Sequence, residues 1–191
     1  MLELLNEIDR SVFIAINSFH NSWLDGLMWY ASEKTIWIPL YIFLAFIFLK
    51  KFGKENFLYL ILLCVLMILC SDVIASLVIK PLAARLRPSH TPGIMENIHI
   101  INNYRGGLYG FVSSHAANSF ALCTFTILSV RKKQISLIML FYATLVSYSR
   151  IYLGVHYPGD IIGGAIIGAA VAAFGFFVLN KFLNYRGLAK I

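Results

Sequence analysis

The chain carries at residues 56–79 the apolar run NFLYLILLCVLMILCSDVIASLVI, in which Asp72 is the only charged residue. A helix needs about 20 predominantly apolar residues to cross the hydrocarbon core of a bilayer. The run therefore predicts a transmembrane helix. The basic residues that follow it, from Lys80 to Arg87, would then lie at one edge of the membrane.

Four further apolar segments are close to the same length: Thr35–Lys50, Ser113–Val130, Gln134–Leu153 and Asp160–Phe182. Upstream of them, Leu2–Phe19 has apolar residues at helical spacing with charged residues between them, a pattern typical of an amphipathic interfacial helix. Trp23–Ser32 is a shorter apolar patch, and it leaves a choice between five and six crossings. The predicted fold is an all-α, polytopic membrane helical bundle of about six helices.

The composition supports one membrane domain. The 191 residues are 59% hydrophobic and 13% charged, whereas soluble domains are about 45–50% apolar and about 25% charged. We expect a single integral membrane domain over residues 1–191, with an interfacial part at 1–33 and an ordered extramembrane loop at 88–111. The N-terminus has no basic segment or small-residue cleavage site, so no removable signal peptide is expected.

The net charge of +7 does not indicate nucleic acid. Basic residues flank membrane spans and set their orientation, and the chain has no basic stripe interleaved with aromatic residues. Cys64, Cys70 and Cys123 all lie inside apolar runs. They have no metal-ligand or redox spacing and are expected to be small buried apolar residues.

Alternation of the segments predicts the orientation. It places the end of the 56–79 run, the start of the 113–130 segment and the 153–160 turn on one side. The opposite side receives nine of the 16 basic residues: Lys50, Lys51, Lys54, Arg131, Lys132, Lys133, Lys181, Arg186 and Lys190. The positive-inside rule assigns that side to the cytoplasm. The loop at 88–111 is then extracytoplasmic, in a multi-pass protein of the cytoplasmic membrane.

The first polar cluster on the outer side is KPLAARLRP at residues 80–88. Lys80 and Arg87 are spaced at two helical turns and are predicted to share a face. Two permanent cations directed at one point suit a phosphate, and arginine can bind it through two parallel hydrogen bonds. Taken alone, the cluster is more typical of cations that anchor a helix end at the membrane surface.

The second cluster, Ser113-Ser114-His115, opens an apolar helix. A helix N-terminus presents free backbone N–H groups and a partial positive charge, which make it an anion site. A serine N-cap followed by an incidental histidine explains the same residues.

The third cluster comprises Ser149, Arg150, His156 and Asp160. Pro158 and Gly159 argue against a continuous helix through it, but a turn would bring the Asp160 carboxylate to the His156 imidazole. Such a carboxylate fixes the tautomer and leaves the other ring nitrogen free to attack. Helix capping by Asp160 is the structural alternative. An arginine that ends an apolar span is costly and usually has a partner or a function.

Together the clusters resemble the signature of the type 2 phosphatidic acid phosphatase (PAP2) superfamily, K-x6-R-P, P-S-G-H and S-R-x5-H-x3-D. The first motif is complete in Lys80, Arg87 and Pro88. The third is complete in Ser149, Arg150, His156 and Asp160. The second reads Val112-Ser113-Ser114-His115, with valine in place of proline and serine in place of glycine. A backbone N–H is retained at Ser114, but the conformation of this loop is less firmly predicted.

The resemblance implies a role for each residue. His156 would attack phosphorus and form a phosphohistidine, Asp160 would orient it, and His115 would protonate the leaving oxygen. The phosphate would be bound by Lys80, Arg87, Arg150, Ser113 and Ser114. No metal or other cofactor is expected, and one carboxylate is too few for a hard-cation site.

The predicted activity is hydrolysis of a lipid phosphate or diphosphate, with undecaprenyl diphosphate as the first choice. Phosphatidylglycerophosphate, phosphatidic acid and lipid A are the alternatives, because the motifs recognise phosphate and not the tail. A non-catalytic lipid-phosphate binder or transporter and a phosphotransferase are the other classes. The partners expected are the lipid substrate and membrane lipids, while the oligomeric state is open.

Two charged residues outside the motifs carry weaker predictions. Asp72 is expected to hydrogen-bond a serine or asparagine on a neighbouring helix. Arg85 is expected to be a solvated or headgroup-contacting cation, although it could meet the second phosphate of a diphosphate. Gly163, Gly164 and Gly168 indicate close helix packing.

Overall fold

The computed structural model describes residues 2–185. Its helices are α1 (Leu2–Ser18), α2 (Ser22–Ser32), a 3-10 helix (Lys34–Trp37), α3 (Ile38–Val73), a π-helix (Ile74–Ile79), α4 (Lys80–Ala83), a 3-10 helix (Pro88–His90), α5 (Ser114–Val130), α6 (Lys133–Tyr152) and α7 (Pro158–Tyr185). The described chain forms no β-strand, apart from one isolated bridge. The all-α prediction is confirmed.

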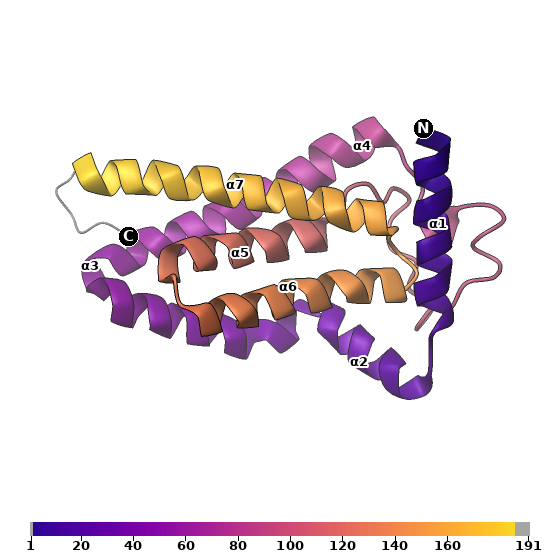
Figure 1. The fold of residues 1–191 in the computed structure, drawn as a ribbon, viewed down its shortest axis with the longest axis horizontal. Helices are drawn as coiled ribbons and strands as arrows, with labels where there is room; N and C mark the ends of the chain where they lie inside the picture. Colours follow the sequence, from indigo (N-terminus) through magenta and orange to yellow (C-terminus); the bar gives the residue numbers. More distant parts are fainter. Residues whose placement is uncertain (1, 186–191) are drawn as a thin grey trace.

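Long helices run back and forth between the two ends of a bundle (Figure 1). Three stretches are long and apolar enough to cross a membrane: Lys34–Ala83, Lys133–Tyr152 and Pro158–Tyr185. The first stretch doubles back at Gly53, whose φ of 73° is left-handed and accessible to glycine at little cost. It therefore supplies two passes, and with α5, α6 and α7 the described residues make five.

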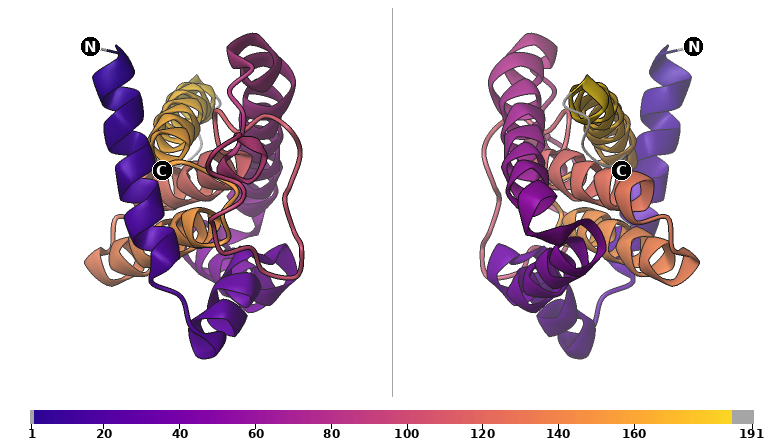
Figure 2. Two further views of the ribbon diagram at one scale, coloured as in Figure 1. Left: turned by 90° about the vertical axis from the view of Figure 1, so that its right-hand side faces the viewer. Right: turned by 90° about the vertical axis from the view of Figure 1, so that its left-hand side faces the viewer.

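The N-terminal helix α1 lies across one end of the bundle, approximately perpendicular to the long helices (Figures 1 and 2). The next helix, α2, leads through a 3-10 turn into the first half of α3. The Trp23–Ser32 patch therefore extends the first pass and does not form a sixth crossing. The placement of α1 in the membrane interface remains a prediction.

The central helix of the bundle is α5, which packs against α3, α6 and α7. Its contact with α7 depends on glycine, because a Cβ at Gly164 would lie 2.4 Å from the Ser113 carbonyl oxygen and one at Gly168 would lie 2.0 Å from the Ala117 carbonyl oxygen. Backbones approach this closely only at small residues. Close packing at these glycines is confirmed.

The outer faces of the bundle remain apolar, with Phe141, Ile166 and Phe174 among the exposed side chains. Exposed apolar surface on this scale is expected where lipid, and not water, surrounds the helices. Cys70 also lies on the exposed surface, whereas Cys64 and Cys123 are buried. The expectation that all three cysteines are buried is therefore wrong for Cys70, because an apolar residue in a membrane helix can face outward.

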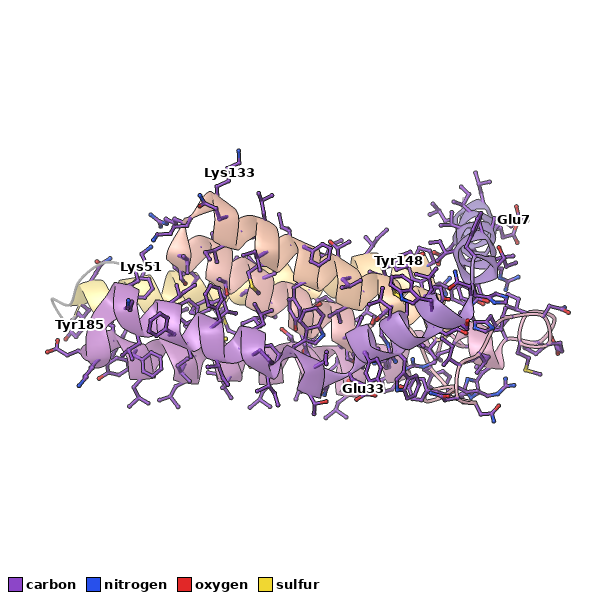
Figure 3. The ribbon with its side chains drawn as sticks, turned by 90° about the horizontal axis from the view of Figure 1, so that it is seen from below. Glu7, Glu33, Lys51, Lys133, Tyr148 and Tyr185 are labelled. Atoms are coloured by element: carbon purple, nitrogen blue, oxygen red, sulfur yellow. The ribbon has the colours of Figure 1, made fainter. Side chains whose placement is uncertain are left out.

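Labelled side chains identify the two ends of the bundle. Lys51 and Lys133 lie at one end, and Glu33 and Tyr148 lie towards the other (Figure 3). The end of α4, the start of α5, the end of α6 and the start of α7 meet at this second end, against α1 (Figure 1). The predicted gathering of the three clusters at one end of the helices is confirmed.

Asp72 occupies the position predicted from the sequence. Its Oδ1 accepts a hydrogen bond of 3.0 Å from the Asn118 amide on α5. A carboxylate within a membrane helix needs such a partner, because an unpaired polar group is costly there.

Candidate active site

Arg87 reaches the site from a short extended segment and not from a helix. The helix α4 ends at Ala84, which has a left-handed φ of 46°. The following residues pair with the far end of the loop, since Arg87 N–H donates to Leu108 O at 3.1 Å and Gly110 N–H donates to Arg85 O at 2.8 Å. The prediction that Lys80 and Arg87 share a helical face is wrong, because the helix stops between them.

The guanidinium of Arg87 is buried and is fixed by three acceptors. Its Nε donates to the Tyr109 carbonyl at 3.1 Å, and one terminal nitrogen donates to the Val155 carbonyl at 3.1 Å. The same nitrogen lies 3.0 Å from Nε2 of His156. The first and third clusters are thus in direct contact.

The tautomer of His156 follows from its two neighbours. Arginine can only donate hydrogen bonds, so Nε2, facing Arg87, must present its lone pair. The proton is then on Nδ1, which lies 3.2 Å from Oδ2 of Asp160. This is the tautomer that a nucleophilic imidazole needs, with the carboxylate on the protonated nitrogen and the lone pair on the other nitrogen, where it accepts from Arg87.

The imidazole of His156 is only 1% exposed. Burial, and then the charge of Arg87 and the neighbouring cations, hold the pKa of His156 well below its ordinary value of 6.5. Both effects disfavour the charged form. The ring is therefore neutral at pH 7, as a nucleophile must be.

Asp160 is fully buried in the first turn of α7, which begins at Pro158. Its Oδ2 accepts the Tyr157 backbone N–H at 3.0 Å as well as facing His156. The carboxylate therefore contacts both the backbone before the helix and the imidazole. The alternative of Asp160 as the N-cap of the last helix is wrong, because α7 begins two residues earlier, at Pro158. The predicted turn between His156 and Asp160 is present.

Lys80 meets the start of α5. Its Nζ donates to Oγ of Ser114 at 2.5 Å, and the same oxygen lies 2.8 Å from Oγ of Ser76. Ser113 is the N-cap of α5 and accepts from Ala116 N–H, while its own N–H donates to the Asp160 carbonyl at 2.9 Å. The free N–H groups of the first turn and the Lys80 ammonium thus lie together, as an anion site requires.

Arg150 ends α6 and is 3% exposed. Its terminal nitrogens donate to Oγ of Ser32 and, at 3.0 Å, to the hydroxyl of Tyr104. Its Nε is buried and has no partner within the described residues. A buried, unpaired guanidinium N–H is costly, and a phosphate oxygen is the kind of group that would satisfy it.

His115 stands in the first turn of α5, where the charges of Arg150 and Lys80 act on it. It also lines an apolar pocket of about 410 Å³ between α3, α5 and α6. Trp37, Phe48, Leu122 and Val146 are among the side chains that line this pocket. The polar site and an apolar cavity therefore meet at His115.

The structure brings the predicted site residues together at one end of the bundle. Contacts join Lys80 to Ser114, Arg87 to His156 and His156 to Asp160, while Ser113 caps the same helix end. Arg150 is the exception in its contacts, because it donates to Ser32 at the end of α2 and to Tyr104 in the loop between α4 and α5.

Sequence reasoning missed the partners that hold Arg150. Ser32 and Tyr104 are isolated polar residues in segments that are far from it in sequence, so no spacing rule identifies them. The expectation for Arg85 is also wrong. It is not a solvated cation, because it donates to Oδ1 of Asp160 at 2.8 Å.

The sequence has clear relatives. The family model described as "PAP2 superfamily" matches residues 59–183. Two proteins named "Lipid A 4'-phosphatase" are 38% identical: that of Bacteroides thetaiotaomicron covers 95% of this chain and 81% of the relative, and that of Porphyromonas gingivalis covers 97% and 77%. "Undecaprenyl-diphosphatase BcrC" of Bacillus subtilis is 27% identical, covering 93% of this chain and 86% of the relative.

The crystal structure of a PAP2-type phosphatidylglycerolphosphate phosphatase from Bacillus subtilis has a similar fold. Its TM-score is 0.67 and its identity is 22%, over 93% of this chain and 87% of that chain. At this identity the likeness concerns the fold alone.

The helical bundle and the named relatives define a membrane lipid phosphatase. The chain belongs to the PAP2 superfamily. The resemblance drawn from the three motifs is confirmed, and so is the enzyme class. The roles of the individual site residues remain a proposal.

Proposed function

We propose that this enzyme removes phosphate from lipid A by way of a phosphohistidine on His156. The observation that supports this chemistry is the position of His156 between Arg87 and Asp160, with Nε2 presented as a lone pair. A binder or transporter needs the cations but has no use for an oriented, neutral imidazole.

In the first step, the Nε2 lone pair attacks phosphorus and the bond from phosphorus to the lipid oxygen breaks. His115 gives a proton to the departing oxygen. In the second step, a water molecule attacks the phosphohistidine, His115 takes up its proton, and the phosphorus–nitrogen bond breaks to release inorganic phosphate. A positioned acid or base of this kind contributes about 10²–10⁴-fold to the rate.

The cations supply the charge stabilisation. Phosphoryl transfer depends chiefly on positioning and on neutralising the equatorial oxygens. Lys80, Arg87 and Arg150 would bind those oxygens, together with Ser113 and Ser114 at the start of α5. Arg150 offers its unpaired Nε for this purpose.

The apolar pocket supports a lipid as the carrier of the phosphate. It borders His115, the proposed proton donor to the leaving oxygen, and is lined mostly by apolar side chains of α3, α5 and α6. An ester oxygen beside His115 would therefore place the attached tail among apolar groups, which is favourable in proportion to the area buried.

The choice of lipid A rests on the relatives. The two lipid A 4'-phosphatases are 38% identical over nearly the whole chain. Undecaprenyl diphosphate, the first choice from sequence alone, is the second candidate, favoured by the relative that is 27% identical. Phosphatidic acid and phosphatidylglycerophosphate follow.

A panel of substrates tests the choice. Purified enzyme is given lipid A, undecaprenyl diphosphate, phosphatidic acid and phosphatidylglycerophosphate, with EDTA present, and phosphate release is measured. We expect kcat/KM for lipid A to exceed each of the others by at least about 10-fold, and EDTA to have no effect. A higher value for undecaprenyl diphosphate would transfer the proposal to the second candidate, and loss of activity in EDTA would exclude the metal-free mechanism.

An Ala45→Trp variant tests the pocket in the same assay, since Ala45 lines it. We expect KM for lipid A to rise by about 10-fold or more, because the indole occupies space needed by the tail. Hydrolysis of water-soluble p-nitrophenyl phosphate is the internal control and should be unchanged. Equal losses for both substrates would mean that the pocket does not bind the tail.

We further propose that the site faces outward from the cytoplasmic membrane. The basic residues of the described chain that lie at the opposite end of the bundle support this orientation under the positive-inside rule: Lys50, Lys51, Lys54, Arg131, Lys132, Lys133 and Lys181.

Cysteine labelling tests this orientation. In a background with the three native cysteines replaced by alanine, Glu96→Cys in the outer loop is expected to react with a membrane-impermeant maleimide in intact cells. Lys132→Cys, also exposed but at the other end of the bundle, is the matched control and should react only after lysis. The reverse pattern would overturn the orientation.

A further inference from the structure

Two charged side chains outside the family motifs connect α1 to the catalytic carboxylate. Arg85 donates through one terminal nitrogen to Oδ1 of Asp160 at 2.8 Å, and through the other to Oδ2 of Asp9 at 2.6 Å. The side chains of Arg85 and Asp9 are 24% and 12% exposed, and that of Asp160 is 0% exposed. A continuous ionic chain therefore runs from the molecular surface to the partner of His156.

The guanidinium of Arg85 is held on more than one side. Besides the two carboxylates, its carbon lies 4.4 Å from the centroid of the Tyr157 ring, in a cation–π arrangement. A planar guanidinium with fixed partners on two edges and an aromatic face beneath it has little freedom. Arg85 can thus hold the Asp160 oxygen that His156 does not use.

Asp9 is engaged through both of its oxygens. Oδ2 accepts from Arg85, and Oδ1 accepts the Gly159 backbone N–H at 2.7 Å. Gly159 immediately precedes Asp160, and a Cβ there would lie 2.8 Å from Oδ2 of Asp9. The absence of a side chain at Gly159 therefore lets the carboxylate reach the turn that carries Asp160.

The position of α1 brings Asp9 to the turn that carries Asp160. The helix lies across the site end of the bundle (Figure 2), and Asp9 fixes both the Arg85 side chain and the backbone next to Asp160. The geometry of the catalytic pair, His156 and Asp160, therefore depends on Asp9, which is 150 positions from Gly159 in sequence.

We infer that Arg85 and Asp9 are positioning residues, which orient the Asp160 carboxylate towards His156 and make the activity depend on the docking of α1. The inference rests on the proposed role of His156. Without Arg85, Oδ1 of Asp160 loses its charged partner within a buried site, and the carboxylate is no longer held at one angle to the imidazole. Without Asp9, Arg85 loses one of its two anchors.

Steady-state kinetics of Arg85→Gln and Asp9→Asn test the inference. We expect kcat to fall by about 10–100-fold in each variant, because groups that orient a catalytic side chain contribute on this scale. KM should stay within about 2-fold of wild type, since neither residue belongs to the proposed phosphate-binding set or lines the apolar pocket. Arg85→Lys should recover part of the lost kcat, because it restores the charge without the planar fork.

Matched controls separate charge loss from positioning. Glu7→Gln removes a carboxylate from the exposed face of the same helix, and Arg131→Gln removes a guanidinium from the opposite end of the bundle. Both should retain wild-type kcat. Thermal unfolding is followed for every variant, and Asp9→Asn, which keeps the side-chain shape, provides the measurement if Arg85→Gln fails to fold.

A double-mutant cycle gives the decisive result. If Arg85 acts through Asp160, adding Arg85→Gln to Asp160→Asn should lower kcat by no more than about 3-fold beyond Asp160→Asn alone. A full second loss would show that Arg85 acts independently and would overturn the inference. Wild-type kcat in both Arg85→Gln and Asp9→Asn would also overturn it. The proposed function fails separately, if His156→Ala retains activity.

Discussion

Replacing His156 by alanine is expected to lower phosphate release by at least about 10⁴-fold, since loss of a nucleophile removes the covalent route altogether. The pocket, the cations and His115 remain, so KM for the lipid should change little. The variant should also form no phosphohistidine. Rapid quenching with a substrate labelled at the phosphate, followed by detection of acid-labile label on the protein, measures this directly.

The control for His156→Ala is His20→Ala. His20 stacks on His99 at a centroid distance of 3.8 Å, and no contact joins it to His156 or Asp160 in the part of the chain that the structure describes, so its variant should match wild type. The low pKa of His156 keeps the ring neutral in the wild-type enzyme between about pH 6 and pH 8. The loss of activity in His156→Ala relative to wild type should therefore be similar throughout that range. Labelled protein in His156→Ala would assign the nucleophile to another residue.

Replacing Asp160 by asparagine is expected to lower kcat by about 10⁴-fold, the size of effect seen when an orienting aspartate beside a catalytic histidine becomes an amide. The amide can donate to Nδ1 of His156, which moves the ring proton to Nε2 and removes the lone pair that faces phosphorus. Arg85 donates at the Oδ1 position, so the amide oxygen is expected there and the amide nitrogen takes the place of Oδ2. Tyr157 N–H then loses its acceptor, and thermal unfolding checks that α7 is preserved. Single-turnover measurements of phosphoryl transfer report the step directly.

Asp72→Asn is the matched control for Asp160→Asn. Asp72 is also a carboxylate on a membrane helix, and its partner is the Asn118 amide, which an asparagine can equally satisfy. We expect its activity to remain close to wild type. A loss smaller than about 10-fold in Asp160→Asn would contradict the tautomer argument.

Much of the site could be predicted from sequence because its determinants are local. Four residues separate His156 from Asp160, and Pro158 and Gly159 indicate the turn that brings them together. Successive apolar segments cross the membrane in alternating directions, so each one returns the chain to a defined side. This alternation predicts that the three clusters lie at the same end. These inferences use only helix length, turn chemistry and alternation.

The parts that sequence did not predict depend on backbone conformation or on distant contacts. Nothing in the residues before Arg87 indicates that Ala84 adopts a left-handed conformation and ends the helix, so a shared face with Lys80 was the natural expectation. Asp9 lies on an amphipathic helix where a carboxylate normally faces water. Its bond to Gly159 follows from the way α1 lies across the bundle.

The apolar pocket beside His115 has a consequence for what happens after the chemistry. On the proposed mechanism, the reaction makes two products of opposite solubility within a few ångströms of each other. Inorganic phosphate would be formed among cations next to the loop between α4 and α5, where water can carry it away, while the shortened lipid would be left among the helices that face the bilayer. The two products would leave in different directions, so the recombination that would reverse the reaction requires both to return to the same site from separate phases.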